Sequence, residues 1–245
     1  MNKISWTLAT TSFFLTASAF ALDPGEQDMA GQKSGTYDYL VYAVTWQPTF
    51  CLLNASNPGC KNYRADFYTH GIWPYFKTTE QTTNKHPSIC ISSPGCSEGE
   101  ACNIDASTLS STLKDPAYRK LVTSDPSGLM QHEWKKHGTC YGKNQTEYFN
   151  DYKNLRNVVH YKDTLTKHIG KTASLKAIQS WFPSNTSFRC ASINGKQYLF
   201  EVFYLINKDG SPFHQEKSLQ IGERCTQSQL TIPDVIPHTE RNTPH

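Results

Sequence analysis

Three segments of the chain carry the dense pattern of β-branched and aromatic residues that is typical of buried strands. They are YDYLVYAVTWQP at 37–48, DFYTHGIWP at 66–74 and KQYLFEVFYLINKDG at 196–210. The first two end at or just before a proline, and the third ends at a turn around Asp209 and Gly210. Because proline cannot donate to a strand ladder and Asp-Gly favours a turn, we predict one strand in each segment.

The polar and apolar residues between these strands follow the longer period of helices. We predict helices over DASTLSSTL at 105–113, DPAYRKLV at 115–122 and DPSGLMQHEWKKHG at 125–138. The last two open on an Asp-Pro pair, which suits a helix start. The longest candidate is TEYFNDYKNLRNVVHYKDTLTKHI at 146–169, whose apolar residues recur every three to four positions as in a helix with one face on the core.

Strands and helices that mix without regular alternation predict an α+β fold, with a mainly antiparallel central sheet flanked by helices. The chain has 245 residues, 37% of them hydrophobic, which can bury one core, so we predict a single domain over 37–230. The polar stretch at 22–36 has no periodicity and is expected to be a flexible lead-in. The stretch at 231–245 has three prolines and is expected to be an irregular tail.

The first 21 residues have the layout of a cleaved secretory signal. A single charge, Lys3, precedes an apolar run that closes on Ala-Phe-Ala at 19–21. The alternative, a membrane anchor, needs roughly 20 uninterrupted apolar residues, and this run is shorter and rich in Thr and Ser. We therefore predict a signal peptide at 1–21 and an exported protein without a membrane anchor.

All the cysteines follow this signal segment. An even number of them in an exported chain predicts disulfides, here four, and no paired C-x-x-C motif supports a thiolate metal site. The eight cysteines are Cys51, Cys60, Cys90, Cys96, Cys102, Cys140, Cys190 and Cys225.

The net charge of the chain argues against one class of nucleic-acid protein. Basic residues number 24 and acidic residues 21, so loss of Lys3 leaves 23 against 21, a formal +2. That charge is too weak for a protein that coats nucleic acid by bulk electrostatics. The nine histidines would make the surface strongly positive below about pH 6, which fits an anionic substrate met in a mildly acidic place.

The segment HEWKKHGTC at 132–140 concentrates ionisable groups at the end of a predicted helix. Zinc proteases place two histidines four residues apart on one helical face, whereas His132 and His137 are five apart and diverge by about 140°. That divergence suits one tetrahedral zinc ion poorly. Both histidines still share one arc of the helix with Glu133 and Lys136. The alternative interpretation is a solvated helix end with charge pairs.

A further histidine lies in the strand segment FYTHGIWPYF at 67–76. In a regular strand His70 shares a face with Tyr68 and Ile72, and Pro74 breaks the strand close to Trp73. A lone histidine here is commonly structural. Together, however, the two segments supply a base, an acid, cations and an aromatic surface, which metal-free phosphodiester transfer needs. The other histidines lie in no comparable cluster and are expected to be surface or structural residues: His86, His160, His168, His214, His238 and His245.

Both segments resemble signatures of the ribonuclease T2 family of secreted acid ribonucleases. FYTHGIWP at 67–74 is similar to the pattern F-T-x-H-G-L-W-P, and HEWKKHGTC at 132–140 is similar to H-E-W-x-K-H-G-T-C. The strand segment from Tyr37 to Cys51 also resembles the family's opening strand, and the likeness spans about 37–225. Tyr68 and Ile72 depart conservatively from the first pattern, and the loop at 77–102 does not align, which leaves base preference open.

The resemblance implies a role for each ionisable residue of the two motifs. His137 would remove the proton from the ribose 2′-OH, and His70 would protonate the departing 5′-oxygen. Glu133 and Lys136 would stabilise the phosphorane, and His132 would hold a phosphate oxygen.

The resemblance also implies what the whole protein does. It would be a metal-independent endoribonuclease that cuts single-stranded RNA to 2′,3′-cyclic phosphate ends, which it opens slowly to 3′-phosphates. Trp73 would stack on a base, with a core tryptophan as the alternative. No metal or cofactor is expected, RNA is the partner, DNA is not cleaved, and the chain is expected to be a monomer. The likeness to bacterial periplasmic members favours the periplasm, with the extracellular space as the alternative.

Two rival functions come from other classes. A zinc-dependent secreted hydrolase would use His132, His137 and His70 as ligands and would lose activity in EDTA. A secreted RNA-binding module without catalysis would lack a motif histidine, and both motifs keep theirs.

Family resemblance and proximity also imply a disulfide pairing. The expected bridges are Cys102–Cys140, Cys190–Cys225, Cys51–Cys60 and Cys90–Cys96. The first of these would tether the end of the catalytic helix.

Overall fold

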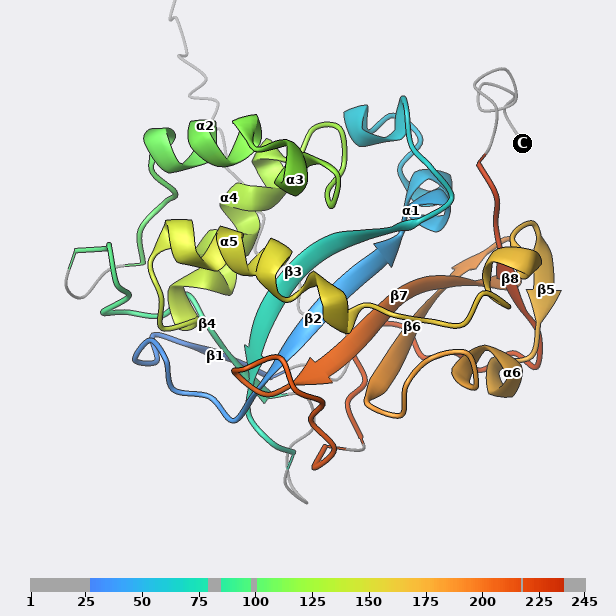
Figure 1. Ribbon diagram of the computed structural model, residues 1–245. Helices are drawn as coiled ribbons and strands as arrows, with labels where there is room; N and C mark the ends of the chain where they lie inside the picture. Colours follow the sequence, from blue (N-terminus) through green and yellow to red (C-terminus); the bar gives the residue numbers. More distant parts are fainter. Residues whose placement is uncertain (1–26, 79–84, 98–100, 217, 236–245) are drawn as a thin grey trace, which may run out of the picture.

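The computed structural model describes residues 27–78, 85–97, 101–216 and 218–235, so the predicted signal peptide at 1–21 lies outside the described residues (Figure 1). The strands are β1 (Gln27–Ala30), β2 (Tyr39–Trp46), β3 (Phe67–Tyr75), β4 (Lys85–Ser88), β5 (Lys171–Ala173), β6 (Thr186–Ile193), β7 (Lys196–Ile206) and β8 (Leu230–Ile232). The helices are α1 (Gln47–Leu53), α2 (Ala106–Lys114), α3 (Pro116–Arg119), α4 (Ser127–Lys136), α5 (Gln145–Asn154) and α6 (Leu175–Gln179). Within the described ranges, no helix combines the length and apolar character that a membrane crossing needs.

One sheet of six strands runs through the middle of the molecule, in the order β3-β2-β7-β8-β5, with β6 also paired to β7. Every pair in it is antiparallel except β7 with β8. The three strands predicted from the sequence are β2, β3 and β7, and Figure 1 shows them side by side. The predicted α+β fold with a mainly antiparallel sheet is confirmed.

Strand β2 is the centre of the core, and all eight of its residues are buried. Tyr42 packs in a large cluster that includes residues of the helices, among them Trp134 of α4. Val41 packs on the opposite face, in a smaller cluster with Trp73 and Phe203. Burial on both faces explains why β2 is almost continuously apolar in sequence.

Helices α2 to α5 lie together beside the edge strand β3 (Figure 1). Helix α4 is anchored there by Met130 and Trp134, which are 1% and 0% exposed, and the ring of Trp134 contacts Tyr148 of α5 at 5.8 Å. A side chain at Gly138 would collide with the Trp134 ring. Glu133 of α4 also accepts a hydrogen bond from Trp73, so the end of α4, which carries the HEWKKH motif, is fixed against β3.

The single long helix predicted at 146–169 is wrong. Helix α5 begins with a capping box between Asn144 and Glu147 and ends at Asn154, and two single turns of 3₁₀ helix follow, at Arg156–Val158 and Thr166–His168. In these turns Arg156 donates hydrogen bonds to Thr69 and to the carbonyl of Phe67, both in β3. The apolar residues that follow α5 pack on the core from these turns and not from one continuous helix. Their spacing in the sequence fits both arrangements, so it could not decide between them.

Two segments expected to be irregular contain strands. Within the expected lead-in at 22–36, β1 pairs in parallel with β4, in the register Gln27 with Lys85 to Ala30 with Ser88. At the start of the expected tail, β8 pairs with β5. Both pairings join segments far apart in sequence, which local patterns cannot predict. Residues 22–26 and 236–245 lie outside the described residues.

The four disulfides are Cys51–Cys60, Cys90–Cys140, Cys96–Cys102 and Cys190–Cys225. The first and last were predicted, whereas the predicted Cys102–Cys140 and Cys90–Cys96 pairs are wrong. The backbone N–H of Cys90 donates to Oγ1 of Thr139 at 3.0 Å, which brings Cys90 to the end of α4. The end of α4 is tethered as expected, but by a different cysteine.

Candidate active site

A β-bulge in β3 sets the direction of the first motif histidine. Ala43 of β2 pairs with Gly71 and the next residue, Val44, pairs with Thr69, so His70 is the extra residue of the bulge. A regular strand would place His70 on the same face as Ile72, so that prediction from the sequence is wrong. The extra residue instead puts His70 beside Trp73, with ring centroids 5.1 Å apart. Bulges commonly redirect a side chain next to active sites in this way.

His70 lies between two buried carboxylates, with 28% of its side chain exposed. Its Nδ1 is 2.6 Å from Oε1 of Glu201 in β7, and its Nε2 is 3.4 Å from Oε1 of Glu133 in α4. Burial alone would lower the pKa of His70, but the charges of Glu201 and Glu133 outweigh burial and raise this pKa to about 10. His70 is therefore charged at neutral pH.

Two residues of β3 determine the position of Glu133: Trp73 donates a hydrogen bond to it, and Gly71 leaves the space that it occupies. The carboxylate is 1% exposed and accepts a 2.6 Å hydrogen bond from Nε1 of Trp73. A Cβ atom at Gly71 would collide with both groups, so only glycine allows this close approach.

His137 follows the last residue of α4 and is buried, with 3% of its surface exposed. Its ring stacks on Trp73 at 5.1 Å and lies 5.7 Å from the ring of His86. Burial, reinforced by the charges of Lys136 and His86, holds the pKa of His137 well below its usual 6.5. Among the described residues its Nδ1 has no hydrogen-bond partner. His137 is therefore neutral at neutral pH.

Trp73 lies between the two motif histidines. It is 5% exposed, and its ring contacts His70, His137 and Phe203. A ring this enclosed offers no free face to a nucleobase, so the structure favours the alternative that Trp73 is a core tryptophan. Its contacts show that it positions Glu133 and both histidines.

His132 and Lys136 lie on a different part of α4 from Glu133 and His137. Both are partly exposed, and they line a pocket of about 700 Å³ with Lys135, Ile89 and Asp28. Burial, with the charge of Lys136, lowers the pKa of His132. The cationic side chains of Lys135 and Lys136 beside His132 make this pocket suited to a phosphate group.

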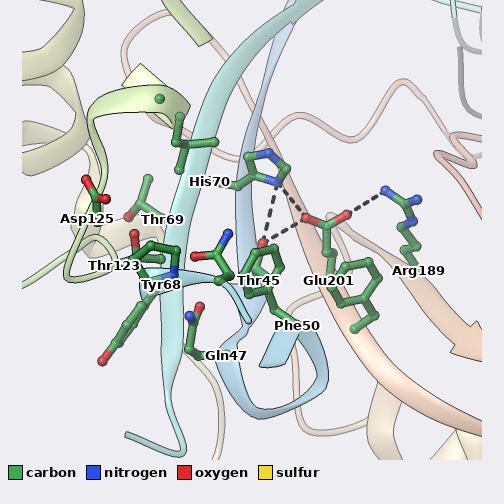
Figure 2. Close-up of a pocket in the computed structure, with 15 residues that line it drawn as sticks. Thr45, Gln47, Phe50, Tyr68, Thr69, His70, Thr123, Asp125, Arg189 and Glu201 are labelled. Atoms are coloured by element: carbon green, nitrogen blue, oxygen red, sulfur yellow. Dashed lines mark hydrogen bonds and ion pairs between the residues drawn. The ribbon is translucent and has the colours of Figure 1, made fainter. Parts of the chain in front are cut away.

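A second pocket, of about 500 Å³, opens beside His70 (Figure 2). Aromatic and amide side chains line it, among them Phe50, Tyr68, Phe200 and Gln47. Aromatic faces with adjacent hydrogen-bonding groups suit a nucleobase.

Two residues of the site were missed by reasoning from sequence. Glu201 had a readable signal, because it is the single charged residue in the apolar run YLFEVFYLI at 198–206. His86 had none, since it lies in the loop at 77–102, outside both sequence motifs. The expectation that His86 lies outside any cluster is wrong, because β4 brings it against His137.

No group of three or more His, Cys, Asp or Glu side chains arranged to hold a metal occurs among the described residues. His70, His132 and His137, the ligands of the zinc alternative, do not converge as a set there. Metal independence itself stays a prediction.

The comparisons with known proteins agree with this geometry. The model of the ribonuclease T2 family matches residues 37–221, which is most of the chain. The chain belongs to the ribonuclease T2 family. Its family makes it an endoribonuclease. The matched residues do not include strand β1.

Two relatives named as ribonucleases support the assignment to the ribonuclease T2 family. The chain is 28% identical to Ribonuclease 1 of Arabidopsis thaliana over 199 residues, which cover 74% of this chain and 81% of that protein. It is 23% identical to a ribonuclease of Aeromonas hydrophila over 192 residues, or 73% of this chain and 76% of that protein.

Solved structures share the fold. Ribonuclease MC1 from the seeds of bitter gourd aligns with a TM-score of 0.56 at 21% identity, covering 80% of this chain and 100% of that chain. An RNase-related protein from Calystegia sepium aligns with a TM-score of 0.59 at 22% identity, covering 82% and 98%.

Proposed function

We propose that this ribonuclease cuts single-stranded RNA by attack of a ribose 2′-OH on its own phosphate, without a metal ion. The products are a 2′,3′-cyclic phosphate and a 5′-hydroxyl, and slower addition of water opens the ring to a 3′-phosphate. One observation carries the proposal. His70 and His137 flank the same tryptophan in opposite charge states, which is what a general acid and a general base require.

Each ionisable group has a part in this reaction. Neutral His137 removes the proton from the 2′-OH, and charged His70 gives a proton to the leaving 5′-oxygen. Lys136 stabilises the negative phosphorane by its charge, and Glu133 contributes through its contact with Nε2 of His70. His132 holds a phosphate oxygen at the pocket that it shares with Lys136.

The pocket beside His70 supports a nucleotide substrate with an accessible base. Its aromatic lining suits stacking, and a stacked base must first leave a double helix, which favours single strands. The solved structure of a ribonuclease MC1 variant contains 5′-UMP, which supports the same class of ligand here. We assign base stacking to this pocket and not to Trp73.

The cysteines of the chain and its family support an exported location. Four disulfides fit an exported protein. We propose a monomer in the periplasm after removal of residues 1–21, with the extracellular space as the alternative.

An oligonucleotide with a single ribose in a deoxyribose strand tests the reaction. In EDTA it should be cut only on the 3′ side of that ribose and should leave a cyclic phosphate. Replacing the single 2′-OH by hydrogen or a methyl ether should abolish cutting, because the nucleophile is gone, while affinity stays within about tenfold, or about 1.4 kcal/mol.

Three results would contradict the proposal. Cutting of the all-deoxy strand would exclude attack by the 2′-OH. Loss of activity in EDTA that zinc restores would favour the zinc hydrolase. RNA binding without any cleavage would favour an inactive binding module.

A further inference from the structure

Glu201 lies where a carboxylate is costly. It is 0% exposed, in the middle of β7, and its neighbours along the strand belong to the apolar run at 198–206. A buried carboxylate is tolerated only when charges and hydrogen bonds compensate for the lost water. Its partners therefore indicate why it is present.

Three other strands of the sheet supply those partners, β2 and β6 beside β7 and β3 beyond β2. Across the sheet Glu201 is directly opposite Thr45 of β2 and Arg189 of β6. The hydroxyl of Thr45 donates to Oε1 at 2.8 Å, and Nη1 of Arg189 donates to Oε2 at 3.0 Å. Nδ1 of His70 reaches the same Oε1 at 2.6 Å from the bulge of β3. Figure 2 shows the four side chains as one connected row.

We propose that Glu201 is a positioning residue of the reaction, which fixes the ring of His70 and selects its protonated form, with Arg189 holding the carboxylate in place. The proposal rests on the proposed role of His70 as the general acid. Because Glu201 occupies Nδ1, the proton that can be transferred is on Nε2, the nitrogen that faces Glu133.

Arg189 has a specific part in this arrangement. Burial alone would raise the pKa of Glu201, but His70 and Arg189 together lower it to about 2, so the carboxylate stays charged at working pH. The guanidinium is also placed over the ring of Phe200, at 5.2 Å from its centroid. A Cβ atom at Gly222 would collide with Arg189, so the backbone there leaves room for it.

The charges around His70 balance. Glu201 from β7 and Glu133 from α4 carry two negative charges, and His70 and Arg189 carry two positive charges. His132 and His137 of the second motif also lie close enough to interact with His70. Removing only the charge of Glu201 leaves one carboxylate to stabilise charged His70, so His70 should lose its proton at lower pH.

The experiment is Glu201→Gln, which keeps the shape and an acceptor oxygen but removes the charge. The alkaline limb of kcat/KM should move to lower pH by roughly one to three pH units, the effect of one opposite charge at contact distance. The change should appear in kcat more than in KM. Titration of His70 by ¹⁵N and ¹³C NMR should move by the same amount. Glu201→Asp, which keeps the charge, should shift the limb less than Glu201→Gln does.

A matched control is Glu216→Gln. Glu216 is another buried carboxylate, 8% exposed, but it binds Thr78 and Ser218 instead of a histidine. Its loss should lower stability without moving the alkaline limb. If Glu201 were only structural, both variants would behave in this way, and that result would overturn the proposal.

The unmodified protein gives a test that does not depend on folding of a variant. In it His70 should remain protonated above pH 8 with a proton on Nδ1, and titration at an ordinary pKa near 6.5 would overturn the proposal. This outcome is distinct from failure of the proposed function, because the NMR titration does not depend on cleavage or on the identity of the product.

Discussion

The substitution Gly71→Ala tests whether Glu133 must lie where it does. A methyl group at position 71 would lie 2.9 Å from Cδ of Glu133, and closer still to its Oε2 and to Nε1 of Trp73. Carbon atoms in contact are ordinarily about 3.5–4.0 Å apart, so the carboxylate would have to move by about 1 Å. That movement would break the 2.6 Å hydrogen bond that Trp73 donates.

The substitution at Gly71 should lower both stability and rate. Loss of a buried hydrogen bond to a charged group costs roughly 1–3 kcal/mol of unfolding free energy, measured by urea denaturation. A catalytic group misplaced by about 1 Å costs on the order of 10²-fold in kcat, which is about 2.7 kcal/mol of activation free energy. The rate is measured on the single-ribose oligonucleotide in EDTA.

Gly128→Ala is the control for the effect of an added methyl group on stability; because Gly128 lines both pockets of the site, it is not a control for the rate. A Cβ atom at Gly128, in α4, meets no atom of the described structure within 4 Å. Because Gly128 is the second residue of α4, alanine there should raise the unfolding free energy by no more than roughly 0.5–1 kcal/mol, the gain in a helix interior. If Gly71→Ala loses stability but keeps kcat within about threefold of wild type, Glu133 is not held for catalysis, and the reasoning is refuted.

Three other predictions follow from the structure. Replacing both Cys90 and Cys140 by serine should lower the unfolding free energy by about 4 kcal/mol, because the loop that they close is 50 residues long. Opening the six-residue loop with Cys96→Ser should cost about 2 kcal/mol. Equal losses in urea denaturation would contradict the reasoning from loop entropy. The pH profile of kcat/KM should have an acid limb well below pH 6.5, set by His137, and an alkaline limb near pH 10, set by His70; steady-state rates that fall from pH 7 to 8 would contradict these assignments. The raised pKa of His70 contributes stability that is complete below about pH 6.5 and is lost as the pH rises towards 10. The midpoint of urea unfolding should therefore fall between these pH values. A constant midpoint would argue against a charged His70 in the folded state.

The sequence predicted the parts of the fold that local patterns encode. Strands β2, β3 and β7 were identifiable because β-branched and aromatic residues cluster in them and a proline or an Asp-Gly turn follows. Helix α4 was identifiable from its Asp-Pro start and from Gly138. The two motifs on β3 and α4 also gave His70, Glu133 and His137, since residue type and spacing are visible in one dimension.

Register and pairing depended on the tertiary structure. The bulge that turns His70 towards Trp73 exists only because β3 has one more residue than β2 over the same length. The exchange of partners between Cys90 and Cys102 depends on β4 meeting the end of α4. Strand β1 forms by pairing with β4, which lies about 58 residues further along the chain.

The sequence by itself determined which residues are the candidates for the chemistry, and the tertiary structure decided the opposite pKa shifts of His70 and His137. A histidine has an ordinary pKa near 6.5 until burial and neighbouring charges change it. Glu201 reaches His70 from β7, and His86 reaches His137 from β4, and neither contact follows from sequence proximity. The division into an acid and a base is therefore a property of packing, because the electric field at each ring comes from residues that only the fold brings together.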